Sequence, residues 1–211
     1  MLKKIVIAGI VIMAFVATSY AQVAIGFKVP FRIQRFSYSN SYDGSDSEMW
    51  FGGLGAFEYG FNSVFALEAV GGYLMSLGGE SEYDGETTSE YKHNVIPIAL
   101  YMKFYFPMAE GSAFHPYLAG GPTFSFNMIT HSAKVNDDYE KTGSTNEICF
   151  GAPDFMIGFD YDIAAAIKLG GALNFAFSSI SYSPEVGDGD WSTSALNFGA
   201  AFTFKYIFRT D

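Results

Sequence analysis

Large apolar residues alternate with small or polar ones along most of this 211-residue chain. The segment 193–208 shows the alternation most clearly, with apolar side chains at its even positions. The even positions carry Leu196, Phe198, Phe202, Phe204, Tyr206 and Phe208, and the odd ones carry Asn197, Gly199, Ala201, Thr203 and Lys205. A period of two predicts a β-strand whose two faces meet different surroundings.

The alternation recurs eight times and predicts strands at about 23–37, 49–60, 64–77, 92–106, 115–129, 148–160, 164–179 and 193–208. Long polar connections near 38–48, 78–91, 130–147 and 180–192 alternate with short ones at 60–63, 107–114 and 161–163. This order is typical of outer-membrane barrels, which have long external loops and short periplasmic turns. We therefore predict an all-β fold, an eight-stranded antiparallel up-and-down transmembrane β-barrel.

Alternation alone does not decide which face is inside, because a soluble lipocalin-like barrel would turn the apolar face inward. The non-apolar face consists mostly of Gly, Ala, Ser, Thr and Asn, which suits a narrow polar lumen better than a solvent surface. Aromatic residues gather near both ends of the predicted strands, as in the interface girdles of membrane barrels. Both features favour an apolar face turned toward lipid.

Some residues depart from the simple pattern. Phe36, Trp50 and Phe150 break the alternation near the loop ends of their strands. Pro97, Pro122 and Pro153 fall inside predicted strands, where each removes a backbone donor. We interpret the three prolines as markers of β-bulges.

The first 21 residues have the features of a secretory signal peptide. Lys3 and Lys4 precede the apolar run Ile5–Ala17, and Ser19 and Ala21 place small residues at a cleavage site. This run is too short for a helical membrane span, which needs roughly 20 residues. We predict a cleaved signal peptide over 1–21, with an uncleaved anchor as the alternative, and one outer-membrane barrel domain over 22–211.

The net charge of −10 is concentrated in the predicted loops. The polar segments 39–48, 78–92, 130–147 and 180–192 hold 15 acidic and 3 basic residues, and the predicted strands are neutral overall. Acidic loops argue against nucleic acid as a partner, because phosphate binding needs a basic surface. Cys149 is the only cysteine, which excludes a disulfide framework.

Nine charged residues fall on the face predicted to line the lumen: Lys28, Arg32, Glu58, Glu68, Lys103, Asp154, Asp160, Lys168 and Lys205. Because isolated buried charges are costly, we expect these residues to pair. The predicted hairpins make Lys28–Glu58, Glu68–Lys103 and Asp154–Lys168 cross-strand neighbours. Lys168 and Lys205 face each other and need an acid nearby, such as Asp154 or Asp160. The network is interpreted as a structural plug, or alternatively as a gated ion path.

The loop carboxylates are candidates for collecting Ca²⁺ or Mg²⁺ at the lipopolysaccharide surface. They are Asp43, Asp46, Glu48, Glu80, Glu82, Asp84, Glu86, Asp137, Asp138, Glu140, Asp188 and Asp190. Their spacing matches no calcium-loop pattern, so we predict no dedicated metal site and interpret these loops chiefly as solvated segments.

Two segments resemble a known family. His115–Asn127 resembles the turn-to-strand signature, and Asn197–Phe208 the closing strand, of the small outer-membrane protein β-barrel domain family of Gram-negative bacteria. The resemblance covers 22–208 and implies a location in the outer membrane and insertion by the barrel assembly machinery. Arg209–Asp211 follow the aromatic end, where many members stop. The family is functionally mixed, so the resemblance implies no single activity.

Catalytic constellations are missing from the sequence. Three histidines are present, and the neighbours His131 and Ser132 would point to opposite sides of a strand. We predict no enzyme, no catalytic residues and no cofactor. The expected function is a structural or surface-interaction role of a monomer, exerted through four acidic loops in contact with lipid and lipopolysaccharide. The alternatives are a narrow channel for small solutes or ions and a membrane component of a secretion or assembly machinery.

Overall fold

The computed structural model describes residues 22–39, 45–77, 79–83, 86–135, 138–182 and 191–209. The predicted signal peptide lies outside these ranges. The strands are β1 (Gln22–Ser39), β2 (Ser45–Gly60), β3 (Phe65–Ser76), β4 (Gly79–Tyr83), β5 (Glu86–Tyr105), β6 (Phe114–Val135), β7 (Asp138–Ala164), β8 (Ile167–Tyr182) and β9 (Trp191–Arg209). Among the described residues no helix is long and apolar enough to cross a membrane.

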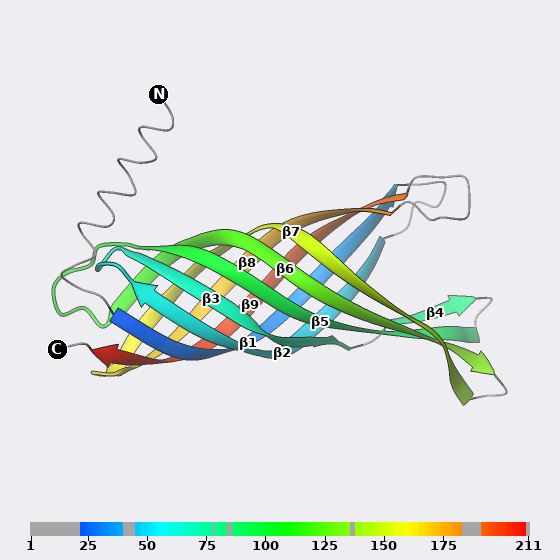
Figure 1. Cartoon of the computed structure of the whole chain (residues 1–211), viewed down its shortest axis with the longest axis horizontal. Coiled ribbons are helices and arrows are strands. Elements are labelled where there is room, and N and C mark those ends of the chain that lie inside the picture. The colour runs from blue at the N-terminus through cyan, green and yellow to red at the C-terminus, as the bar shows by residue number, and fades with distance from the viewer. Residues whose placement is uncertain are drawn as a thin grey trace, which may run out of the picture.

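Eight of these strands form a closed antiparallel barrel. They follow the order β3-β2-β1-β9-β8-β7-β6-β5, and a pairing between β3 and β5 closes the circle. The strands are tilted relative to the long axis of the barrel (Figure 1). The predicted fold is therefore confirmed. β4 lies outside the barrel and pairs with the loop end of β5.

One end of the barrel, the turn end, carries the short connections 61–64, 106–113 and 165–166. Local interactions set these turns. The side-chain oxygen of Asn62 accepts hydrogen bonds from the N–H groups of Val64 and Phe65, each at 2.8 Å. Gly111 has a φ of 80°, which other residues rarely adopt. The first residues of β1 pair with the last residues of β9 at this end, and the opposite end is called the loop end.

The faces of the strands follow the predicted alternation. Large apolar side chains are exposed on all eight barrel strands, as in Phe27, Phe57, Ile98 and Phe202, the last with 76% of its surface exposed. Their inward neighbours, such as Lys28, are buried. Exposed aromatic residues gather at the turn end: Phe104, Phe106, Phe159, Tyr161, Tyr206 and Phe208. A continuous apolar belt with an aromatic rim fits lipid and is unlike the surface of a soluble barrel.

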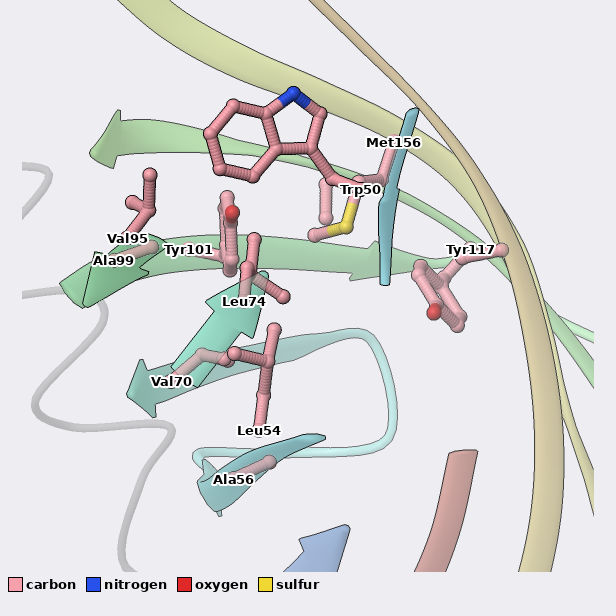
Figure 2. Packing of buried hydrophobic residues seen from close by; sticks show 12 residues of the cluster. Trp50, Leu54, Ala56, Val70, Leu74, Val95, Ala99, Tyr101, Tyr117 and Met156 are labelled. Atoms are coloured by element: carbon pink, nitrogen blue, oxygen red, sulfur yellow. The ribbon is translucent and has the colours of Figure 1, made fainter. Parts of the chain in front are cut away.

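The lumen is less uniformly polar than predicted. A cluster of buried apolar residues, mainly on β2, β3 and β5, fills part of it (Figure 2). Trp50, Leu74 and Tyr101 belong to this cluster. Trp50 broke the sequence alternation because its ring is large, yet it occupies the inward register of β2 and is only 3% exposed.

Two predicted loops are largely strand. Their described residues 79–83 and 86–91 pair as β4 with β5, and 130–135 and 138–147 pair as β6 with β7, as far as Tyr83–Glu86 and Val135–Asp138. The sequence pattern missed them because strands that extend beyond lipid do not need one apolar face. Backbone pairing continues there without a hydrophobic period.

The proline prediction is partly confirmed. The β6–β7 register shifts between Gly121 and Thr123, so Pro122 opposes both Ala152 and Pro153 in a bulge. Beyond this bulge the register places Phe150 opposite Phe124, which is exposed. The bulge adds one residue to β7 and so shifts the alternation by one position, which accounts for the break at Phe150. The prediction is wrong for Pro97, because the register is the same on both sides of it.

Toward the loop end the closed barrel separates along two seams. Described pairing between β7 and β8 ends at Asp154–Ala176, and that between β2 and β3 ends at Trp50–Ser76. β4 and the loop ends of β5, β6 and β7 continue as an open sheet, which we call the distal sheet (79–83, 86–93, 129–135 and 138–147). Figure 1 shows it leaving the barrel apart from the loop ends of β1 and β2.

Candidate functional site in the barrel lumen

A chain of ion pairs crosses the lumen toward its turn end. Glu68 lies between two lysines, with its carboxylate oxygens 2.5 Å from Lys28 Nζ and 3.0 Å from Lys103 Nζ. Lys103 Nζ also lies 2.7 Å from Glu58 Oε2. Lys205 Nζ extends the chain, at 2.8 Å from the same Glu58 oxygen and 2.5 Å from Asp160 Oδ2. We call these six residues the lumen cluster: Lys28, Glu58, Glu68, Lys103, Asp160 and Lys205.

The lumen cluster is balanced in charge, with three ammonium groups and three carboxylates from six different strands. Five of the six side chains are at most 5% exposed, and that of Glu58 is 14% exposed. Charges buried this deeply are tolerated because each has partners of opposite sign. The arrangement can fill and neutralise the cross-section of a barrel of this size, whose interior is about wide enough for side chains.

Tyrosines pack around the lumen cluster. The hydroxyl of Tyr105 lies 2.7 Å from Asp160 Oδ2 and 3.0 Å from Glu58 Oε1, so its single proton has two carboxylate acceptors within reach. The ring of Tyr117, 1% exposed, lies beneath Lys103 Nζ at 4.4 Å from its centroid. The aromatic rings close the space around the ammonium groups and add cation–π attraction.

A separate ion pair lies nearer the loop end. Arg32 Nη2 is 3.0 Å from Asp154 Oδ2, and the hydroxyl of Tyr101 donates to the same oxygen at 2.9 Å. Asp154 is 1% exposed. It sits at the residue where pairing between β7 and β8 ends, so this contact ties β1 to β7 across the lumen at the base of the seam.

The pairing predicted from the hairpins is right in part. Glu68 and Lys103 pair as expected. Lys168 and Lys205 are register partners on β8 and β9, and Asp160 supplies an acid to Lys205. The Lys28–Glu58 prediction is wrong: the register sets Lys28 opposite Leu54, and its side chain instead binds Glu68 on β3.

The Asp154–Lys168 prediction is also wrong, because the register sets Asp154 opposite Ala176 and Lys168 opposite Asp162. Lys168 Nζ lies 3.3 Å from Asp162 Oδ1, and His115 Nε2 lies 3.0 Å from Asp162 Oδ2. These groups line an open cavity of about 260 Å³ at the turn end, whose lining includes Glu58 and Lys205 of the lumen cluster. Lys168 is thus at the rim rather than in the central network.

At the loop end, Glu48 departs from its predicted place in an acidic loop. It is 2% exposed and its Oε2 lies 3.3 Å from His93 Nδ1, whose ring packs edge-on against Trp50 with centroids 4.3 Å apart. Glu48 and Trp50 share the even, inward register of β2 with Leu54 and Ala56. Extending the alternation of β2 by one step would have placed Glu48 on the inward face, although it would not have named His93 as its partner.

The structure gives little support to the hypothesis that the loop carboxylates bind metal ions. Asp43, Asp84, Asp137, Asp188 and Asp190 lie outside the described residues. Among the residues that are described, no group of three or more His, Cys, Asp or Glu is placed to hold a metal ion.

The comparisons with known proteins agree with this architecture. The model of the outer membrane protein beta-barrel domain family matches residues 7–204. The structure of the outer membrane protein OprG from Pseudomonas aeruginosa is similar with a TM-score of 0.55 and 14% identity, covering 90% of this chain and 98% of that one. No curated protein sequence is a significant match.

Two further solved structures are similar at lower TM-scores. A major outer membrane protein from Thermus thermophilus has a TM-score of 0.49 and 14% identity, with 87% of this chain and 99% of that one covered. Ail, the attachment invasion locus protein of Yersinia pestis, has a TM-score of 0.43 and 10% identity, with 88% and 99% covered. The match of the family model, together with a closed barrel and its apolar belt, shows that this chain belongs to the outer membrane protein beta-barrel domain family and resides in the outer membrane of a Gram-negative bacterium.

Proposed function

We propose that the protein is a non-enzymatic barrel with a closed lumen, which serves as a membrane anchor for the acidic surface at its loop end. The lumen cluster carries this proposal. Its six side chains neutralise one another across the lumen and leave the central cation, Lys103, fully buried. A conducting pore needs water or mobile ions where these paired groups lie.

The acidic loop-end surface is the part available to partners. The distal sheet carries seven acidic residues and three lysines among its described ranges. At about 3.3–3.4 Å per residue, the 27 residues of β7 extend far beyond the ~9–11 that cross a bilayer. Paired strands that continue beyond the membrane and carry charged residues support a surface-interaction role.

Planar-bilayer recordings test the closed lumen. We expect wild-type protein to give no unitary conductance in neutral salt. The triple variant Lys28→Ala, Glu68→Ala and Lys103→Ala, which removes three side chains from the centre of the lumen cluster, should give discrete openings. Steady unitary conductance from the wild type would overturn the proposal in favour of a narrow channel.

The narrow channel is the second candidate because the cavity at the turn end reaches Glu58 and Lys205 from outside.

The third candidate is a membrane component of a secretion or assembly machinery. Position-specific crosslinking in a Cys149→Ser background tests it. Glu110→Cys places a thiol on an exposed residue at the turn end, and Ser144→Cys places one on an exposed residue of the distal sheet. Crosslinks to envelope proteins from position 110 alone would favour the machinery.

A further inference from the structure

Among the described residues, the distal sheet ends on β7 in an edge without a paired strand. Pairing of β7 with β6 continues as far as Asp138–Val135, but its described pairing with β8 stops at Asp154. Beyond that point β8 pairs with β9 up to Tyr182–Trp191. Among the described residues, the backbone of β7 from Asp138 to Gly151 therefore has hydrogen-bonding partners on one side only.

This edge lacks some of the features that protect edge strands. The opposite edge, β4, has five residues, whereas the segment 138–147 of β7 has ten and contains no proline. Natural edges are usually short, kinked or covered, because open N–H and C=O groups invite another strand. β7 has two bulges, one at Ala152 and Pro153 at the base of this edge and one at Thr142 within it. Between them, from Gly143 to Gly151, the register with β6 is unbroken, so this part of the edge is not kinked.

The outer part of the edge lies beyond the apolar belt. Along β7 from the barrel outward, Ile148 is the last large aliphatic residue and is 81% exposed. The segment 138–147, which lies beyond it, is polar apart from Tyr139. Its backbone groups are therefore placed in water, where a soluble or surface-bound partner can reach them.

Charge selects among possible partners. The distal sheet holds Glu80, Glu82, Glu86, Glu90, Asp138, Glu140 and Glu147 against Lys92, Lys134 and Lys141. A second copy of this chain would bring two acidic edges together, and like charges on neighbouring strands are destabilising. A strand rich in lysine or arginine would be attracted to the same edge.

We propose that the free edge of β7, Asp138–Glu147, binds an extended basic segment of another protein by β-strand addition. The proposal rests on the surface-interaction function and specifies how that surface binds. Main-chain hydrogen bonds to β7 supply affinity, and the net negative charge of the distal sheet supplies selectivity.

The test uses the full barrel in nanodiscs and a fluorescent octapeptide of alternating lysine and valine. The matched control is the same peptide with every backbone amide N-methylated, which keeps the charge and removes the donors. We expect saturable binding that weakens with salt and is about tenfold or more weaker for the methylated peptide, because several hydrogen bonds are lost. Equal binding of the two peptides would overturn strand addition.

Hydrogen exchange locates the added strand. Adjacent residues of a strand direct their N–H groups to opposite sides, so one of the pair Ser144 and Thr145 faces β6 and the other faces the free edge. Peptide binding should protect amides of 138–147 that exchange freely in the unbound barrel. Of the variants Ser144→Pro and Thr145→Pro, the one that leaves the amide protection of β6 intact should abolish peptide binding.

Two outcomes separate failure of this inference from failure of the proposed function. Binding of both peptides without protection of β7 would leave an acidic interaction surface but no strand addition. Disulfide dimers of the Ser144→Cys variant in the Cys149→Ser background, formed without peptide, would assign the edge to a second copy and overturn the choice of a basic partner. Neither result bears on conductance.

Discussion

At the scale of single residues, the lumen cluster predicts how individual charges contribute to stability. Glu68 is fully buried between two lysines. Replacing it with glutamine leaves an uncompensated buried charge, so Glu68→Gln should lower the free energy of unfolding by about 3–5 kcal/mol. Urea unfolding in lipid vesicles measures this change.

Two variants serve as controls for Glu68→Gln. Glu110→Gln removes the same charge from an exposed residue of a turn and should change stability by less than about 0.5 kcal/mol. The double variant Glu68→Gln with Lys103→Met restores a balanced lumen, so its loss should be smaller than the sum of the single losses. Strict additivity of the two changes would show that the cluster does not act as a unit.

The alternation of side chains identified which charges face inward, but it did not identify all their partners. Glu68 and Lys103 come from strands that are neighbours in the barrel, and their pairing was predictable. Lys28 binds Glu68 two strands away, because the stagger of a closed barrel sets which residues meet across the lumen. That stagger depends on the register of all eight strands, which a local pattern does not contain.

At the scale of elements, the β6–β7 hairpin divides into a structural part in the barrel and an extension in the distal sheet. Replacing Ala133–Glu140 with Asn-Gly would join the register partners Ser132 and Lys141 by a two-residue turn. The barrel should fold as before, with stability within about 1 kcal/mol, because the lumen contacts are untouched. Binding of the lysine-valine peptide should weaken, because the replacement removes Asp138–Glu140 from the free edge and leaves Lys141–Glu147. Heat-dependent electrophoretic mobility and peptide titration measure the two effects.

A single-residue deletion inside the barrel gives the contrasting case. Removing Gly158 from β7 would shift one side of the strand by one position and turn inward groups such as Asp154 or Asp160 toward lipid. We expect this variant to show no band of folded protein in the electrophoretic assay. The deletion removes one residue, whereas the hairpin replacement, which the barrel tolerates, removes six. The same rule explains why sequence predicted the membrane-spanning parts of the strands and missed the hairpins: only the spanning parts must keep different faces toward lipid and lumen.

At the scale of the whole molecule, the direction of the apolar face decides how the protein responds to charge. Phe202 lies midway along the outward face of β9 and is 76% exposed, whereas Tyr206 lies near the turn end. In a bilayer, Phe202→Lys should cost about 2–4 kcal/mol and Tyr206→Lys about 0–1 kcal/mol, because the penalty for charge falls from the midplane to the interface. Unfolding titrations of both variants in vesicles of one lipid composition provide the comparison. Equal stability of the two variants would mean that the apolar belt does not face lipid. Wild-type protein that stays folded and single-species in buffer without detergent would mean the same. In either case the proposals of a closed lumen and of a distal sheet beyond the membrane would both be wrong, because both require lipid around the belt.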